Sequence, residues 1–293
     1  QASTRLQDVT SFGKSIGGSA TNVAVACARH GESVTILTRT GDDPFGEYAV
    51  EQLGRYGIDT TFVSPVPGMQ SVLTFCEMFP PDEFPLYIWR NPTAPDMYIE
   101  PSTLPLSRVR EANVYWSTAT GLSREPSRSA HLAACTARGR KPNTVLDLDY
   151  RPMFWESAAQ AHDAVADAFE NVTIAIGNLE ECSVAVGERE PERAADALLE
   201  RGIELAVIKM GPRGVLAKTA EERIELPPIP VEVVNGLGAG DAFGGALCHG
   251  LSAGWPLART LQFANAAGAI VATRFECSSA MPDSARRPRT NCS

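Results

Sequence analysis

Three glycines and one carboxylate lie close together in the run VVNGLGAGDAF, at residues 233–243. The pattern predicts a loop that passes into a helix. Glycines at such a junction leave backbone N–H groups accessible, and the start of a helix adds positive potential. Gly238, Ala239 and Gly240 can therefore hold a transferring phosphate, and Asp241 can accept a proton from a hydroxyl nucleophile. The alternative is an ordinary glycine-rich turn in which Asp241 only caps the helix.

A second glycine-rich segment stands near the start of the chain, with the sequence GGSATNVA at residues 17–24. It resembles the N-terminal signature Gly-Gly-x-x-x-Asn of the ribokinase-like (PfkB-type) carbohydrate kinases. The run Gly238-Ala239-Gly240-Asp241 resembles the C-terminal signature of that family. The resemblance implies a sugar kinase with Asp241 as the catalytic base and main-chain amides around the γ-phosphate. It also implies sugar contacts from Gly17, Gly18 and Asn22.

The composition indicates a protein that acts on small molecules. A formal net charge of −9 and a pI near 5.1 argue against a nucleic acid or an anionic membrane as the partner. No apolar run approaches the roughly 18 residues of a membrane span. The seven cysteines are dispersed without a Cys-x-x-Cys pair, which indicates reduced thiols, and the four histidines show no metal-ligand spacing. We therefore expect a cytoplasmic enzyme.

Apolar strands and helical stretches alternate along most of the chain, which predicts an α/β fold with a mostly parallel sheet. The expected strands are residues 33–38, 114–117, 144–148, 172–176 and 205–210, followed by a hairpin of 214–219 and 223–226. The expected helices include 45–56, 191–201, 241–251 and 257–273. Between residues 60 and 90 the chain is rich in β-formers, Pro and Gly, which indicates a small inserted antiparallel sheet.

The resemblance implies a ribokinase-like, three-layer α/β/α architecture. We expect residues 1–293 to form a single kinase domain, with lid segments at about 5–16 and 60–92. Residues 278–293 are polar and are expected to form a disordered tail. The family begins with a core strand that carries a substrate-binding Asp. No apolar strand precedes Phe12, so we expect that strand to be missing from this chain.

Asn178 and Glu181 follow a predicted buried strand and begin a helix. The family resemblance implies that this Asn-x-x-Glu motif organises a magnesium ion and its waters near the phosphates. An amide and a carboxylate one helical turn apart suit a hard cation that prefers oxygen ligands. The alternative is an N-cap Asn with a Glu in the first turn of the helix.

The nucleotide site is expected to use five residues. By resemblance, the strand-end turn KMGPRG covers ATP with Lys209, Gly211 and Gly214, and a plain hairpin turn is the alternative. Asn265 stands where the family places an adenine-pocket Asn, although its small neighbours can equally serve close helix packing. Asn235 completes this set, in the position where most relatives carry Asp.

Charge indicates the class of substrate. Arg90 and Arg151 each follow an apolar strand, near the sheet edge where open α/β sheets bind ligands. Two guanidinium groups at one cleft suit a carboxylate, whereas a neutral sugar does not require them. The alternative pairs Arg151 with Asp147 or Asp149 and leaves Arg90 solvated. The sequence DLDYRP at 147–152 resembles the keto-sugar-acid kinases of the family.

Three details resemble the 5-dehydro-2-deoxygluconokinases of inositol breakdown: Asn235, the run RNPTAPDM at 90–97 and the run SFGK at 11–14. This resemblance implies ATP-dependent phosphorylation of the 6-hydroxyl of 5-dehydro-2-deoxy-D-gluconate. The rivals are 2-dehydro-3-deoxygluconate kinase, ribokinase or fructokinase, and a truncated relative that binds ligands without turnover. Glycine spacing argues against a nicotinamide-dependent oxidoreductase, and no Gly-x-x-x-x-Gly-Lys-Ser/Thr is present. The family resemblance also allows a monovalent cation and a homodimer formed through the lid sheet.

Overall fold

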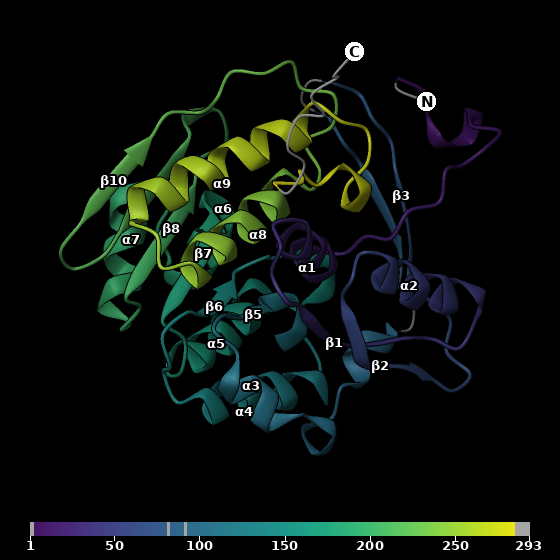
Figure 1. Ribbon diagram of the computed structural model, residues 1–293, viewed down its shortest axis with the longest axis horizontal. Helices are drawn as coiled ribbons and strands as arrows, with labels where there is room; N and C mark the ends of the chain where they lie inside the picture. Colours follow the sequence, from purple (N-terminus) through teal and green to yellow (C-terminus); the bar gives the residue numbers. More distant parts are fainter. Residues whose placement is uncertain (1–2, 81–82, 91–92, 285–293) are drawn as a thin grey trace, which may run out of the picture. The chain divides into compact units, whose positions relative to one another are not determined.

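The computed structural model describes residues 3–80, 83–90 and 93–284 (Figure 1). The chain divides into two compact units. The first unit comprises Gln1–Pro92 together with Ile229–Ser293, and the second comprises Thr93–Pro228. The first unit contains both glycine signatures, and the second contains Asn178, Glu181 and the turn after Lys209.

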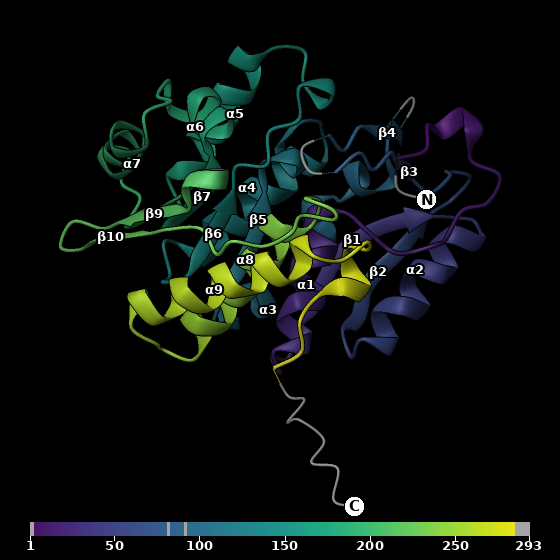
Figure 2. The same ribbon diagram turned by 90° about the horizontal axis from the view of Figure 1, so that it is seen from above.

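The second unit is built on a six-stranded sheet with the order β10-β9-β8-β7-β6-β5. Its strands are β5 Tyr115–Thr118, β6 Thr144–Asp147, β7 Ile174–Asn178, β8 Leu205–Lys209, β9 Val215–Lys218 and β10 Arg223–Leu226. Strands β5 to β8 run parallel, and β9 and β10 form an antiparallel hairpin at one edge. Figure 2 shows β7 to β10 of this sheet from a second direction. All four residues of β6 are buried, as expected of a parallel strand covered on both faces.

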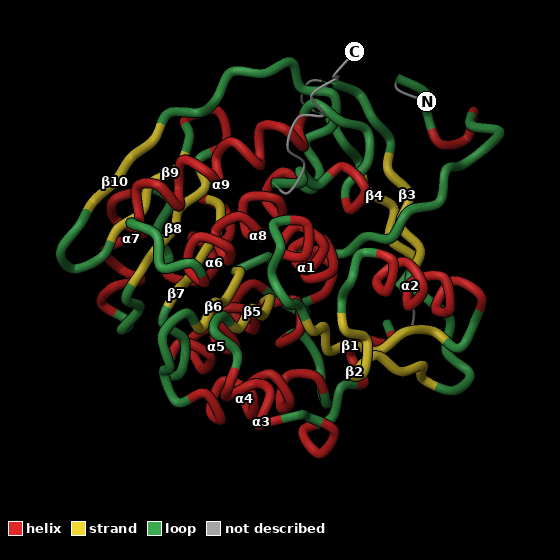
Figure 3. The backbone as a smooth tube through the Cα atoms, in the orientation of Figure 1, coloured by secondary structure: helices red, strands yellow, loops and turns green. Residues whose placement is uncertain are grey.

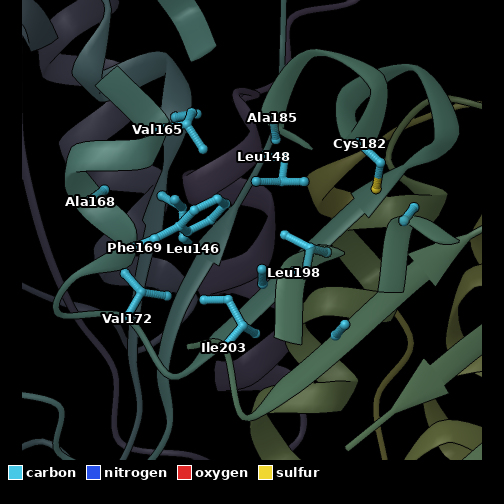
Figure 4. Packing of buried hydrophobic residues seen from close by; sticks show 14 of the residues in the cluster. Leu146, Leu148, Val165, Ala168, Phe169, Val172, Cys182, Ala185, Leu198 and Ile203 are labelled. Carbon is cyan, nitrogen blue, oxygen red and sulfur yellow. The ribbon is translucent and has the colours of Figure 1, made fainter. Parts of the chain in front are cut away.

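The helices of this unit are α3 Leu106–Glu111, α4 Ser127–Arg138, α5 Ala158–Phe169, α6 Leu179–Val186 and α7 Pro191–Glu200. The apolar sides of α4, α5, α6 and α7 pack on the sheet in one buried cluster. Figure 4 shows Phe169 of α5 beside Leu146 of β6, with Val172 and Ile203 close by. This core fixes the ends of β6, β7 and β8, where polar side chains project.

The first unit contains α1 Ser19–Arg29, β1 Thr35–Gly41, α2 Pro44–Arg55, β2 Asp59–Val66, β3 Leu73–Cys76, β4 Leu86–Trp89, α8 Ala239–Ser252 and α9 Leu257–Ala272. Helices α1, α8 and α9 pack together although α1 is more than 200 residues from the other two (Figure 1). Gly245 makes the contact between α1 and α8 possible, because a Cβ there would lie 2.3 Å from the Cβ of Ala26.

Short 3-10 helices connect these elements: Leu6–Asp8, Pro95–Tyr98, Pro101–Thr103, Ala119–Leu122, Pro152–Phe154, Gly211–Arg213 and Ser278–Ala280. The last of these lies within the predicted disordered tail, and Ser278, Ala280 and Met281 are buried. Residues 285–293 of that tail lie outside the described residues.

The predicted strands 33–38, 114–117, 144–148, 172–176 and 205–210, the hairpin and the named helices are confirmed, with ends that differ by at most three residues. One pairing is corrected. Residues 61–63, in the β-rich stretch after residue 60, were expected in an antiparallel sheet, but they lie in β2, which pairs parallel with β1. Only β3 and β4 form the antiparallel ribbon, which Figure 3 shows as two adjacent yellow segments. The helix α2 between β1 and β2 explains the parallel pairing, because it returns the chain to the same end of the sheet.

Candidate active site

Asp241 lies in the first turn of α8, directly after the glycine-rich loop. Gly238 is the N-cap of this helix and has a φ of 82°, in the left-handed region that favours glycine. Cys277 packs against Gly238, since a Cβ on Gly238 would lie 3.2 Å from the Cβ of Cys277. Burial, followed by the charge of Asp241, raises the pKa of the Cys277 thiol to about 11, so the thiol stays neutral at physiological pH.

The start of α8 has the features of an anion site. The backbone N–H groups in the first turn of a helix have no acceptor within the helix, and Gly238 supplies no side chain that caps them. Those N–H groups belong to Ala239, Gly240 and Asp241, and the helix dipole adds positive potential in front of them. This end of α8 can therefore stabilise negative charge.

Two side chains of α1 hold the carboxylate of Asp241. The Ser19 hydroxyl donates to Oδ1 at 3.0 Å, and the Asn22 amide donates to Oδ2 at 2.7 Å. Ser19 and Asn22 lie one helical turn apart, so both reach the same neighbour on α8. The contacts of α1 with α8 thus connect the N-terminal and C-terminal signatures of the sequence.

Asn22 is buried, and both ends of its amide are engaged within the protein. Its oxygen accepts a hydrogen bond from the Ser278 hydroxyl at 2.5 Å. Gly18, the N-cap of α1, has a φ of 98°, and Gly17 precedes it with open space where a Cβ would stand. Sugar contacts from Gly17, Gly18 and Asn22 stay a prediction.

Asn235 has a structural role in the glycine-rich loop. It is 3 % exposed, its Oδ1 accepts from the Leu237 N–H at 3.0 Å, and its Nδ2 donates to the Phe275 carbonyl at 2.8 Å. The side chain therefore forms an Asx turn and ties the loop to the segment after α9. Its predicted contact with the nucleotide stays a prediction.

Arg90 follows β4 directly and is half-buried. Residues 91 and 92 of the run RNPTAPDM lie outside the described residues.

On α9, Gly268 lies against the start of α8, because a Cβ there would be 3.1 Å from the Ala239 carbonyl oxygen. The small residues beside Asn265 thus serve close helix packing, which is the alternative that the sequence left open.

A second group of polar residues lies at the carboxyl ends of β6, β7 and β8. The Lys209 ammonium is 3.7 Å from Oδ1 of Asp147. Asp147 is buried, and this oxygen has no hydrogen-bond partner among the described residues. Parallel strands bring Asp147, Asn178 and Lys209 to one edge of the sheet.

Asn178 and Glu181 form a capping box at the start of α6. The Glu181 N–H donates to Oδ1 of Asn178 at 2.9 Å, and the Asn178 N–H donates to Oε2 of Glu181 at 2.7 Å. The N-cap alternative is thus present in the structure. Burial raises the pKa of the Glu181 carboxyl above its ordinary value, although the positive charge of Lys209 opposes this shift.

Arg151 lies beside this group. It forms an ion pair with Asp149 at 3.0 Å, and its second nitrogen lies 3.8 Å from Oε1 of Glu181. The pairing with Asp149 is one of the alternatives left open by the sequence. The side chain of Arg151 remains 43 % exposed, and its contact with a substrate stays a prediction.

Gly211 begins the 3-10 helix after β8, Gly214 follows it, and both have positive φ values. A Cβ on Gly214 would lie 2.0 Å from the Leu226 carbonyl oxygen, so this glycine is required by the β9–β10 hairpin. Gly211 has open space at the corresponding position. The hairpin alternative therefore accounts for Gly214, and a nucleotide contact stays a prediction for both.

Three residues of the site were not predicted from the sequence: Ser19, Ser278 and Asp147. Ser19 lies inside the GGSATNVA segment, and Asp147 ends a buried strand. The sequence around each of these two residues therefore indicated a place near the site. The sequence around Ser278 contained no such indication, because its contact with Asn22 joins positions 256 residues apart.

The pfkB family carbohydrate kinase model matches residues 2–284, so the chain belongs to the pfkB family of carbohydrate kinases. It is therefore a phosphotransferase that acts on an alcohol group of a sugar, as predicted. The 5-dehydro-2-deoxygluconokinase of Geobacillus thermodenitrificans (strain NG80-2) is 31 % identical over 94 % of this chain and 84 % of the relative. The enzyme of that name from Bacillus subtilis (strain 168) is 28 % identical over 94 % and 86 %.

Solved structures confirm the ribokinase-like fold class. A protein assigned as ribokinase II from E. coli, in complex with ATP and Mg²⁺, has a TM-score of 0.86 over 96 % of this chain and 91 % of its own, at 22 % identity. Aminoimidazole riboside kinase from Salmonella enterica, complexed with aminoimidazole riboside and an ATP analogue, has a TM-score of 0.75 at 27 % identity, over 91 % and 88 %. In the described part of this chain, no helix is long and apolar enough to cross a membrane.

Proposed function

We propose that this enzyme transfers the γ-phosphoryl group of ATP to the 6-hydroxyl of 5-dehydro-2-deoxy-D-gluconate, a step of myo-inositol catabolism. The observation that carries the proposal is Asp241, held by Ser19 and Asn22 in the first turn of α8. The relatives named 5-dehydro-2-deoxygluconokinase support this choice of substrate, since they cover 94 % of the chain.

In the proposed reaction, Asp241 accepts the proton of the attacking hydroxyl. A positioned base of this kind contributes about 10²–10⁴ in rate. The N–H groups of Ala239, Gly240 and Asp241, with Gly238 before them, stabilise the charge of the transferring phosphoryl group. Ser19 and Asn22 fix the carboxylate, so little reorganisation is needed when the hydroxyl arrives.

The residues at the ends of β6 and β7 fit a magnesium ion. Mg²⁺ binds through one or two carboxylates and keeps several waters. Asp147 and Glu181 are buried carboxylates, and Oδ1 of Asp147 has no hydrogen-bond partner among the described residues. We propose that Glu181, oriented by Asn178, and Asp147 hold the ion and its waters. When bound, the ion neutralises charge on the ATP phosphates.

The other predicted site residues are assigned to the binding of the nucleotide and of the sugar. Lys209 provides a positive charge at the sheet edge for the nucleotide phosphates, and Gly211 lies in the turn that covers them. Gly214 and Asn235 shape the two loops of the nucleotide site, and Asn265 contacts the adenine. We propose that Arg90 and Arg151 bind the carboxylate of the sugar acid, together with sugar contacts from Gly17, Gly18 and Asn22.

We also propose a homodimer formed through the β3–β4 ribbon. Phe75 of β3 packs edge-on against Phe12 and Trp89, and the last two are 58 % and 57 % exposed. Sedimentation velocity of the purified protein tests the dimer, and a single monomeric species would exclude it. A cytoplasmic location is proposed because the reaction uses ATP.

The function is tested by measuring ADP release with 5-dehydro-2-deoxy-D-gluconate, 2-dehydro-3-deoxygluconate, ribose and fructose. We expect turnover of the first substrate and a loss of at least 100-fold in Asp241→Asn with ATP affinity retained. The matched control is Asp163→Asn on the exposed side of α5, which should keep wild-type activity. Turnover of ribose or fructose alone contradicts the sugar-acid assignment. If Asp241→Asn retains a tenth of the wild-type rate, Asp241 is not the base.

A further inference from the structure

Three hydrogen-bonded side chains connect the segment after α9 to the carboxylate of Asp241. The Ser278 hydroxyl donates to Oδ1 of Asn22 at 2.5 Å, and the Asn22 amide donates to Oδ2 of Asp241 at 2.7 Å. Ser278 is 1 % exposed and Asn22 is 5 % exposed, so water does not replace these partners. The chain of contacts thus runs through the interior of the first unit.

The orientation of the Asn22 amide follows from these neighbours. An amide side chain has one end that donates and one end that accepts. A flipped amide would place its oxygen against the Asp241 carboxylate, where two acceptors repel each other. Because the Ser278 hydroxyl can donate to the amide oxygen, it favours the orientation in which the NH₂ group faces Asp241.

Ser278 also contacts the segment that leads into the N-terminal signature. Its hydroxyl lies 3.0 Å from the carbonyl oxygen of Ile16, directly before Gly17 and Gly18. The 3-10 helix Ser278–Ala280 is fixed in turn, because the carbonyl of Met281 accepts from Arg29 of α1 at 2.7 Å. Because a hydroxyl carries one hydrogen, it donates to Oδ1 of Asn22, the shorter of its two contacts, and the Arg29–Met281 contact keeps this segment against α1.

We infer that Ser278 is a positioning residue for the phosphoryl transfer, which acts on Asp241 through the Asn22 amide. This inference rests on the proposed role of Asp241 as the base. Ser278 touches no reacting atom; it keeps the Asn22 amide directed at the carboxylate, so that the base stays in the position from which it accepts the proton. Loss of the hydroxyl therefore lets the carboxylate leave this position, while the binding surfaces for ATP and sugar stay in place.

The test compares Ser278→Ala with Ser279→Ala, which removes the same atom from the adjacent residue. The Ser279 hydroxyl donates instead to the carboxylate of Glu276, so this control should keep wild-type rates. For Ser278→Ala we expect kcat to fall about tenfold, with KM for ATP and sugar changed less than about twofold.

A double-mutant cycle shows whether Ser278 acts through Asn22. In an Asn22→Ala background, Ser278→Ala should cost less than about twofold in kcat, because the connecting amide is already gone. Ser278→Cys, which keeps a weak donor of similar size, should restore part of the rate. Thermal melting of each variant confirms that it is folded; a Ser278→Ala variant that does not fold is replaced by Ser278→Cys in the same cycle.

Two results would overturn this inference while leaving the proposed function intact. One is a Ser278→Ala variant with a wild-type kcat while Asp241→Asn is inactive. The other is a tenfold loss that persists in the Asn22→Ala background. An active Asp241→Asn would instead overturn the proposed function, and the inference with it, so the two failures are distinguishable.

Discussion

The Lys209 ammonium faces the buried Asp147 carboxylate across strand β7, with 3.7 Å between Nζ and Oδ1. The Asp147 side chain is 5 % exposed, whereas that of Lys209 is 23 % exposed. The lysine therefore compensates the charge of a buried carboxylate, while its own side chain remains partly accessible to solvent. This arrangement suits a residue that both stabilises the fold and can reach a ligand phosphate.

The first prediction concerns this pair. Lys209→Met leaves the Asp147 charge buried without its cation, so the free energy of unfolding should fall by about 2 kcal/mol. Urea-induced unfolding at pH 7.5 measures the change. The double variant Lys209→Met with Asp147→Asn should regain part of the loss, because the uncompensated charge is gone. Strictly additive losses in the double variant would show that the two groups do not interact.

The second prediction concerns the contact between α1 and α8. Gly245→Ala places a methyl group 2.3 Å from the Cβ of Ala26, so the helices must separate and stability should fall by about 1–3 kcal/mol. Gly54→Ala, within α2, is the matched control, because nothing lies within 4 Å of a Cβ there. Removal of that helical glycine should be neutral or stabilising by about 0.5 kcal/mol. Thermal unfolding of both variants gives the comparison, and equal melting temperatures would contradict it.

The third prediction concerns pH. Burial, followed by the nearby His249, lowers the pKa of His30 from 6.5 to about 4. The unfolded chain therefore binds a proton on His30 between these two values while the folded protein does not, so stability falls as the pH falls through this range. At pH 5 the loss relative to pH 7.5 should be about 2 kcal/mol.

Urea unfolding of the wild type and of His30→Gln at both pH values measures this contribution. The variant has no imidazole at position 30 to protonate, so its pH-dependent loss should be smaller by about 2 kcal/mol. An equal loss of stability in the two proteins would show that His30 is not the group responsible.

Much of the fold could be predicted because it depends on local patterns. The apolar run at 205–210 and the helical spacing at 191–201 each reflect which faces are buried, and burial repeats with the period of the element. The two glycine signatures likewise depend on backbone geometry that only a few residue types allow. The pairing of β2 with β1 could not be predicted in this way, because the period of a strand does not say which neighbour it joins or in which direction.

The amino-acid sequence by itself determined the family, the α/β class and the identity of Asp241 as the residue at the start of a helix, because these follow from motifs and from hydrophobic periodicity. Only the tertiary structure decided which side chains hold that carboxylate. Asn22, Ser278 and Asp241 come from three distant parts of the chain, and packing of α1 against both α8 and the 3-10 helix Ser278–Ala280 brings them within hydrogen-bond distance. Contacts of this kind depend on how helices pack, and residue spacing along the chain does not encode that directly.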